Sequence, residues 1–475
     1  SAQTPKWVEK ARKAVFSVVT YDKGNQIKGT GNGFYIDNMG TALSDYSLFE
    51  GADRAVVINA DGKQLDVLSI MGANSMYDVV KFNTSFDKKQ VSLPVAVQPA
   101  KVGETVYLLP YSTQKATTLQ TGKVTAVDSI DVRSFYYTLE MKTGEKMVSC
   151  PIMNAQGEVL GMIQRNASAE SMESYALGAS FGVNLGISAL SMNDGALNQI
   201  GIKKALPDTE EQALVYLYMS AETMDNESYS KLLNDFLVQY PNSMEGYIRR
   251  ANLNMLGVDA GKYTLAEEDL KKAMEVATNK SECNYQLAKS IYGYLLSLGD
   301  KEPHTAWTYE KALELVRNAI QMENQPLHIQ LEGDILFAQG NYADAFTSYN
   351  KVNQSELASA ATFYSACKAK QLMEGSDMNE VLALMDSAIV KLNKPYMDEA
   401  APYFYERAEL RAQAGKFKEA VMDYNTFHDA VLGKVTALFY FQREQAEMQC
   451  RMYQQALNDI NKAVEMAPED VDFWV

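Results

Sequence analysis

The chain has 475 residues, of which 47% are hydrophobic and 22% charged, and this composition is that of an ordinary globular protein with room for two or more domains. No run of eighteen apolar residues occurs, which excludes a membrane-spanning helix. The four cysteines form no Cys-x-x-Cys pair, and no phosphate-binding loop or dinucleotide fingerprint is present. We therefore expect no disulfide framework, no metal ion and no cofactor.

The net charge of −16 is unevenly distributed along the chain. Residues 1–200 contain 18 basic and 19 acidic side chains, whereas the remainder contains 26 basic and 41 acidic ones. An acidic second half repels nucleic-acid phosphates and anionic lipid. We expect protein or peptide partners, with no nucleic acid and no membrane insertion.

The first part of the chain carries seven short motifs in a fixed order. They are Gly29-Thr-Gly-Asn-Gly-Phe34, Ser44-Asp-Tyr-Ser47-Leu-Phe-Glu-Gly-Ala52, Tyr77-Asp78-Val-Val-Lys-Phe82, Gly103-Glu-Thr-Val-Tyr-Leu-Leu-Pro110, Gly122-Lys-Val-Thr-Ala-Val127, Gly144-Glu-Lys-Met-Val-Ser-Cys-Pro151 and Gly157-Glu-Val-Leu-Gly-Met-Ile163.

This series, over roughly residues 7–190, resembles the Deg-type family of trypsin-like serine proteases. The resemblance implies an all-β double-barrel trypsin-like domain over residues 1–200. Relatives of this family are often exported to a bacterial periplasm, and the chain begins at Ser1 without a methionine. We therefore expect an exported protein, periplasmic or secreted, whose signal peptide has been removed.

The resemblance also identifies the positions of the catalytic triad. The family histidine falls on Ser47, the aspartate on Asp78 and the nucleophilic serine on Val148, when the nucleophile turn is aligned on Pro151. Valine has no nucleophile, and a serine in place of histidine is no base near neutral pH. No histidine occurs before His304. The domain is therefore predicted to be a pseudoprotease, with its His and Ser lost.

An active alternative remains open at the same turn. Ser149 is a candidate for a relocated nucleophile, with Lys142 or Lys146 as its base, and Cys150 is a second candidate. A lysine base must be buried to lose its proton near neutral pH. A base supplied by a partner chain is a further route to activity.

From about residue 208 the pattern becomes helical and repeats itself. A triplet of residues recurs along this part: a small residue, a bulky residue four positions later, and a small or apolar residue three positions after that. These spacings place the members of each triplet on one helix face. These units resemble tetratricopeptide repeats, about six of them over residues 201–475, the last cut short at Val475. The triplets are Ala266/Leu270/Ala273, Ala312/Val316/Ala319, Ala345/Tyr349/Val352, Val381/Met385/Ala388, Ala420/Tyr424/Phe427 and Ala456/Ile460/Ala463.

In this repeat family, first-helix positions just off the packing face line a concave peptide-binding groove. Aromatic, amide and acidic groups occupy those positions here. They are Asn252, Gln330, Asp334, Phe337, Tyr405, Glu409, Phe441, Gln445 and Met448.

Together these features predict a pseudoprotease fused to a repeat scaffold that binds proteins or peptides in the bacterial cell envelope. Two other interpretations are an active protease using Ser149 or Cys150, and a barrel domain that merely caps the repeats. A cap predicts a cleft filled by local side chains such as Met147 or Tyr46.

Overall fold

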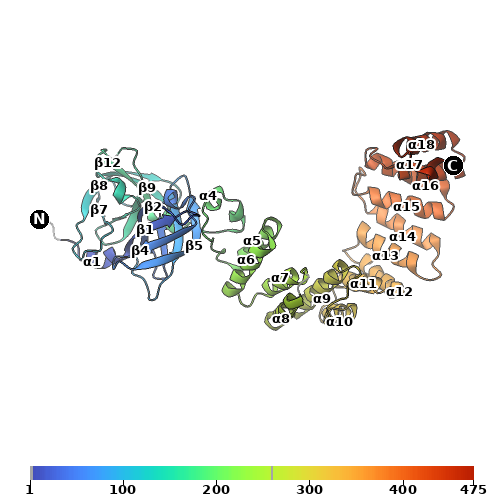
Figure 1. Cartoon of the computed structure of the whole chain (residues 1–475), viewed down its shortest axis with the longest axis horizontal. Helices are drawn as coiled ribbons and strands as arrows, with labels where there is room; N and C mark the ends of the chain where they lie inside the picture. Colours follow the sequence, from blue (N-terminus) through green and yellow to red (C-terminus); the bar gives the residue numbers. More distant parts are fainter. Residues whose placement is uncertain (1–3, 169, 258–259, 475) are drawn as a thin grey trace. The chain divides into compact units, whose positions relative to one another are not determined.

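The computed structural model describes residues 4–168, 170–257 and 260–474 (Figure 1). Ser1 and Val475, on which two expectations above rest, lie outside the described residues. The chain forms two compact units, Ser1–Pro241 and Asn242–Val475. Two β-barrels followed by a helical region confirm the predicted fold class.

The first barrel is closed by six antiparallel strands in the order β1-β2-β3-β6-β5-β4. Alternate residues of β1 and β5 are buried, as expected for strands with one face toward a core. Phe16, Tyr35 and Phe82 pack edge to face inside this barrel. The strands are β1 (Val15–Tyr21), β2 (Ile27–Tyr35), β3 (Thr41–Ser44), β4 (Arg54–Ile58), β5 (Gln64–Asn74) and β6 (Val79–Thr84).

The second barrel is closed in the corresponding order β10-β11-β12-β9-β8-β7. Its core includes Val106, Leu139, Cys150 and Ile152, all fully or almost fully buried. The strands are β7 (Thr105–Leu108), β8 (Gln120–Ser129), β9 (Phe135–Glu140), β10 (Pro151–Met153), β11 (Val159–Ile163) and β12 (Glu173–Gly178).

Short helical segments and one helix pair complete the first unit. The four-residue helix α2 (Tyr46–Phe49) follows β3, and the single turn η2 (Glu145–Met147) precedes β10. The helices α5 (Glu210–Thr223) and α6 (Asn226–Gln239) also belong to this unit.

The second unit is a succession of antiparallel helix pairs in which each helix packs against the next. The predicted triplets lie at these interfaces, and almost all of their members are buried. Gly333 is a packing requirement, because a Cβ there would lie 2.6 Å from the ring of Tyr349. The helices are α7 (Met244–Met255), α8 (Ala260–Val276), α9 (Lys280–Ser297), α10 (Tyr309–Met322), α11 (Pro326–Ala338), α12 (Tyr342–Asn353), α13 (Ala360–Leu372), α14 (Met378–Val390), α15 (Ala401–Gln413), α16 (Phe417–Ala430), α17 (Ala437–Gln449) and α18 (Tyr453–Met466).

Buried ion pairs join the two helices of several pairs. Both carboxylate oxygens of Asp423 accept hydrogen bonds from Arg407, and Asp459 is held in the same way by Arg443. Among the described residues, no helix is long and apolar enough to cross a membrane.

Candidate functional site

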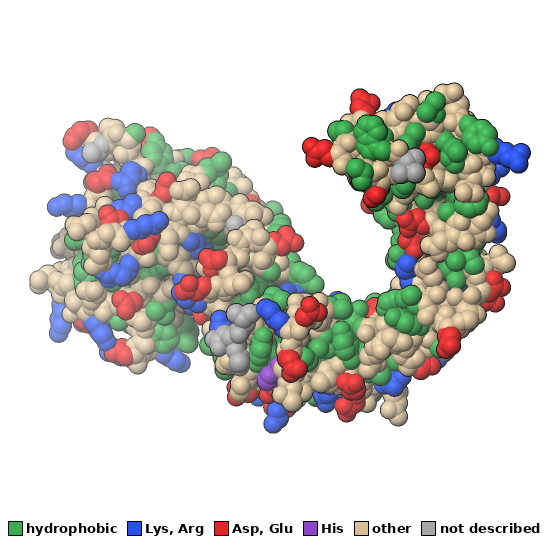
Figure 2. Space-filling view, turned by 45° about the vertical axis from the view of Figure 1, so that its right-hand side comes forward, with side chains coloured by type: hydrophobic (Ala, Val, Ile, Leu, Met, Phe, Trp, Pro, Cys, Tyr) green, Lys and Arg blue, Asp and Glu red, His purple; other side chains and the backbone are tan. Residues whose placement is uncertain are grey.

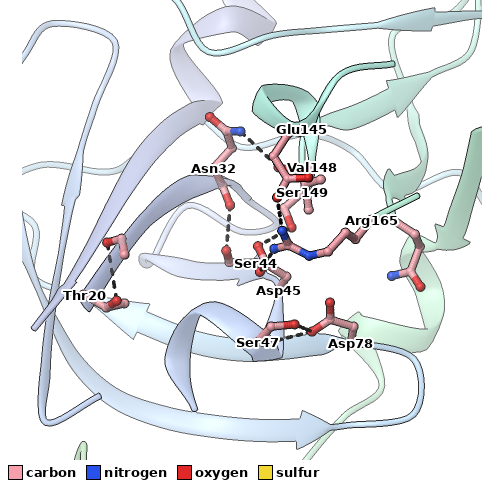
Figure 3. A network of polar contacts seen from close by, with 12 residues as sticks. Thr20, Asn32, Ser44, Asp45, Ser47, Asp78, Glu145, Val148, Ser149 and Arg165 are labelled. Carbon is pink, nitrogen blue, oxygen red and sulfur yellow. Dashed lines mark hydrogen bonds and ion pairs between the residues drawn. The ribbon is translucent and has the colours of Figure 1, made fainter. Parts of the chain in front are cut away.

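Ser47 and Asp78, two of the triad-equivalent positions, lie together. The backbone N–H and the hydroxyl of Ser47 both donate to Asp78 Oδ1, at 2.7 and 2.6 Å (Figure 3). Ser47 is the second residue of α2, and Asp78 immediately precedes β6. The Asp78 carboxylate thus holds both the backbone and the side chain of Ser47.

The turn predicted to hold the nucleophile is closed by a hydrogen bond within its own backbone. Val148 is buried, and its N–H donates to the carbonyl oxygen of Glu145 at 3.3 Å. Ser149 adopts φ 68°, a left-handed conformation that favours glycine, and its N–H donates to Ile163 O at 2.8 Å. Asn32 on β2 fixes the turn from the other barrel, because its side-chain amide donates to the carbonyl oxygens of Lys146 (2.7 Å) and Val148 (3.0 Å).

Below this turn lies a buried polar network centred on Asp45. Ser149 Oγ donates to Asp45 Oδ1 at 2.8 Å, and Arg165 lies 3.5 Å from Asp45 Oδ2 while also pairing with Glu145 (Figure 3). Burial raises the pKa of Asp45 above its usual value, although the Ser149 hydrogen bond and the charge of Arg165 lower it. Asp45 and Ser149 are 3% and 0% exposed, whereas the side chains of Arg165 and Glu145 are exposed, so the network joins the two barrels from a buried hydrogen bond to the protein surface.

A cavity of about 500 Å³ opens beside the network. This volume lies in the range of small-molecule and peptide side-chain sites. Tyr46 does not fill it, because that side chain lies in the core of the first barrel and its hydroxyl donates to Ala196 O at 2.9 Å. Met147 forms part of the wall. The lining residues are Ser17, Thr30, Gly31, Asn32, Asp45, Pro110, Tyr111, Glu145, Lys146, Met147, Val148 and Arg165.

An active protease at this turn would need a buried lysine as base or a reactive cysteine as nucleophile, and the candidate lysines and Cys150 lie in other environments. Lys142 is exposed and pairs with Glu170 at 3.1 Å, and Lys146 is exposed as well. Burial raises the pKa of the Cys150 thiol to about 12, so this cysteine is a poor nucleophile. The only side-chain hydrogen bond described for Ser149 Oγ goes to Asp45.

A known protein family matches the stretch of the chain that contains most of these residues. The trypsin-like peptidase domain family matches residues 31–162, a stretch that includes Ser47, Asp78 and Val148. The first unit therefore carries a trypsin-like peptidase domain. A comparison of the chain with curated proteins finds no match.

Within this trypsin-like domain, the sequence analysis missed the residues that organise the cleft. Asp45 stands inside a motif quoted for the resemblance, but nothing in that motif marks it as buried. Arg165 and Asn32 are more than 100 residues from one of their partners, and only the folded barrels bring them together. The signal that the sequence does contain is the position of Asp45, a charged residue that directly follows the buried strand β3.

The predicted groove residues lie on the first helices of their pairs. Tyr405 and Glu409 on α15 are joined through Gln442 of α17, which accepts from Tyr405 and donates to Glu409 at 3.3 Å. Phe441 packs against Phe473, with ring centroids 5.1 Å apart, so its ring is at least partly structural. The others are Asn252 on α7, Gln330, Asp334 and Phe337 on α11, and Gln445 and Met448 on α17.

Proposed function

We propose that the trypsin-like domain is a non-catalytic binding module, fused to a tetratricopeptide-type scaffold that binds protein or peptide partners. The observation that carries this proposal is the turn at Val148. The N–H that an oxyanion hole directs toward substrate is bonded instead to Glu145 O, beside an open cavity. A binding module requires the cavity, whereas a protease requires a base and a free oxyanion turn.

The helical unit supports the scaffold half of the proposal. Its paired helices and buried small-residue positions agree with tetratricopeptide packing, and its acidic surface suits polypeptide ligands. The resemblance to exported Deg-type relatives supports a place in the periplasm or outside the cell, where such a protein would join components of a cell-envelope assembly.

A fluorophosphonate probe tests the absence of catalysis, because it labels only activated serine nucleophiles. We expect no labelling of the full chain and no digestion of casein, under conditions in which trypsin gives both. Labelling that survives Ser47→Ala and disappears in Ser149→Ala would overturn the proposal.

That outcome corresponds to the second candidate function, a hydrolase in which Asp45 is the base for Ser149. The 2.8 Å hydrogen bond and the raised pKa of Asp45 favour it. The complete burial of Ser149 argues against it, because a nucleophile must reach its substrate. If this hydrolase exists, each of the single variants Asp45→Asn and Ser149→Ala abolishes labelling by the fluorophosphonate probe.

Filling the cavity tests the binding function directly. Peptides selected from a random library on the full chain should lose at least about tenfold in affinity for Thr30→Trp, whose ring would occupy the space between the barrels. Gln26→Trp, at an exposed position outside the cavity, is the matched control. Equal affinities for both variants, measured by fluorescence polarisation, would place the bound peptides elsewhere.

A further inference from the structure

The carboxylates of the helical unit fall into two groups according to their partners. At the helix interfaces, Asp269, Asp423 and Asp459 each receive two hydrogen bonds from one arginine. Such bidentate pairs satisfy both the charge and the geometry of a carboxylate. In each of these pairs a cation of the chain itself compensates the carboxylate.

Asp334 on α11 is different. Both of its described hydrogen bonds go to Oδ1, from the hydroxyl of Tyr349 at 2.6 Å and from Gln330 Nε2 at 3.5 Å. Within the described part of the chain, Oδ2 has no donor, and no lysine, arginine or histidine lies within 4.0 Å of this carboxylate. The described donors of Asp334 are therefore neutral groups at one oxygen, and the other oxygen is left to solvent or to a ligand.

The surroundings of Asp334 shift the pKa values of ionisable side chains. Burial raises its pKa, and burial together with the charge of Asp334 raises the pKa of Tyr292 to about 12. The side-chain oxygen of Gln330, next to Asp334, is buried and has no hydrogen-bond partner among the described residues. One buried acceptor without a described donor, the Gln330 oxygen, thus lies beside a carboxylate whose Oδ2 is open to solvent and whose Oδ1 is bonded to the hydroxyl of Tyr349.

We propose that Asp334 and Gln330 on α11, beside the hydroxyl of Tyr349, form a slot for one basic side chain, a lysine or arginine, of a polypeptide partner. An ammonium or guanidinium group has several donors, so it can serve Asp334 Oδ2 and the Gln330 oxygen together. Acidic side chains are spread over the helical region on the face shown in Figure 2, and the excess of acidic residues after position 200 favours a basic partner. The inference rests on the proposed scaffold function and names the chemistry of its partner.

The slot is not simply a repeated acidic position. Glu409 on α15 lies 75 residues after Asp334 and occupies the equivalent place on its helix. There, however, Lys368 lowers the pKa of Glu409 against the effect of burial, so a cation of the chain already compensates it in part. Among the described residues Asp334 has no such neighbour, which is why the proposal concerns this residue.

The test uses the full chain and a fluorescein-labelled twelve-residue peptide of alternating lysine and leucine, with its fully acetylated form as the uncharged match. We expect the lysine peptide to bind and Asp334→Asn to weaken it at least about tenfold, the scale of a charge-assisted hydrogen bond. Asp398→Asn, which removes one exposed carboxylate, should leave binding unchanged. Asp334→Asn should also keep or raise the melting temperature, because it removes a buried, poorly compensated charge.

Three outcomes would overturn the slot: no binding of the lysine peptide, equal binding of the acetylated peptide, or equal weakening by Asp334→Asn and Asp398→Asn. A fall in melting temperature for Asp334→Asn would assign this carboxylate a structural role instead. None of these outcomes bears on the fluorophosphonate and cavity-filling experiments, so the proposed function stands or fails separately.

Discussion

Replacing Gly33 by alanine is expected to destabilise the first barrel by about 3 kcal/mol or more, the upper range for overpacking in a dense core. A Cβ at this position would lie 2.5 Å from Phe16 Cε1 and closer still to the carbonyl oxygen of Leu43. The backbone of β3 and a buried aromatic ring cannot both move away cheaply. Because Gly33 adjoins Asn32, which fixes the nucleophile turn, the cavity should be lost as well.

Hydrogen exchange followed by mass spectrometry at increasing urea concentrations measures this effect in the full chain, since peptides of β1–β6 report on the barrel separately from the helices. Gly186→Ala is the matched control, because a Cβ there meets nothing within 4 Å and the residue is exposed. Equal stabilities for the two variants would show that β2 and β3 can separate without cost.

The order of motifs along the chain was sufficient to predict the two barrels, because each motif marks a strand or turn that the fold needs. Gly33, in the first of these motifs, lies directly against the carbonyl oxygen of Leu43 on β3. The helical pairs could be predicted equally well from the sequence, because the buried triplet positions follow directly from the helical period of 3.6 residues.

The polar architecture of the site was not predictable in the same way. Asp45, Ser149 and Arg165 are scattered over 120 residues, and their hydrogen bonds exist only because two barrels meet. The sequence also predicted the groove residues as a class without separating Phe441, which packs on Phe473, from Asp334, which lacks a cation. Burial and partners, which distinguish such residues, are properties of the packed chain.

Replacing Glu447 by glutamine is expected to stabilise the last helix pair at pH 8 by about 1–3 kcal/mol, the usual cost of a poorly satisfied buried polar group. Glu447 is 3% exposed, and its Oε1 is buried without a hydrogen-bond partner in the part of the chain that the structure describes. Burial first, and the carboxylate of Asp459 second, raise the pKa of Glu447 well above its usual range. In the preceding pair, Arg411 stands at the equivalent position and binds Asp423 at 2.8 Å.

The direction of the pH dependence follows from that raised pKa. The folded chain holds the Glu447 proton more tightly than the unfolded chain, whose glutamate titrates near pH 4.3. The protonated Glu447 therefore contributes fully to the free energy of unfolding below that pH. This contribution is lost as the pH rises toward the pKa that Glu447 has in the folded chain, by at most about 1.4 kcal/mol per pH unit. Hydrogen exchange of α17 and α18 between pH 6 and 8, corrected for its intrinsic pH dependence, should show this decline in the natural chain and a flatter profile in Glu447→Gln.

Glu447→Arg should restore the arrangement of the preceding pair and stabilise further, whereas Arg411→Glu should transfer the pH dependence to α15 and α16. Parallel profiles for the natural chain and Glu447→Gln would mean that Glu447 is ionised in the folded protein, and the account of the pair would then be wrong.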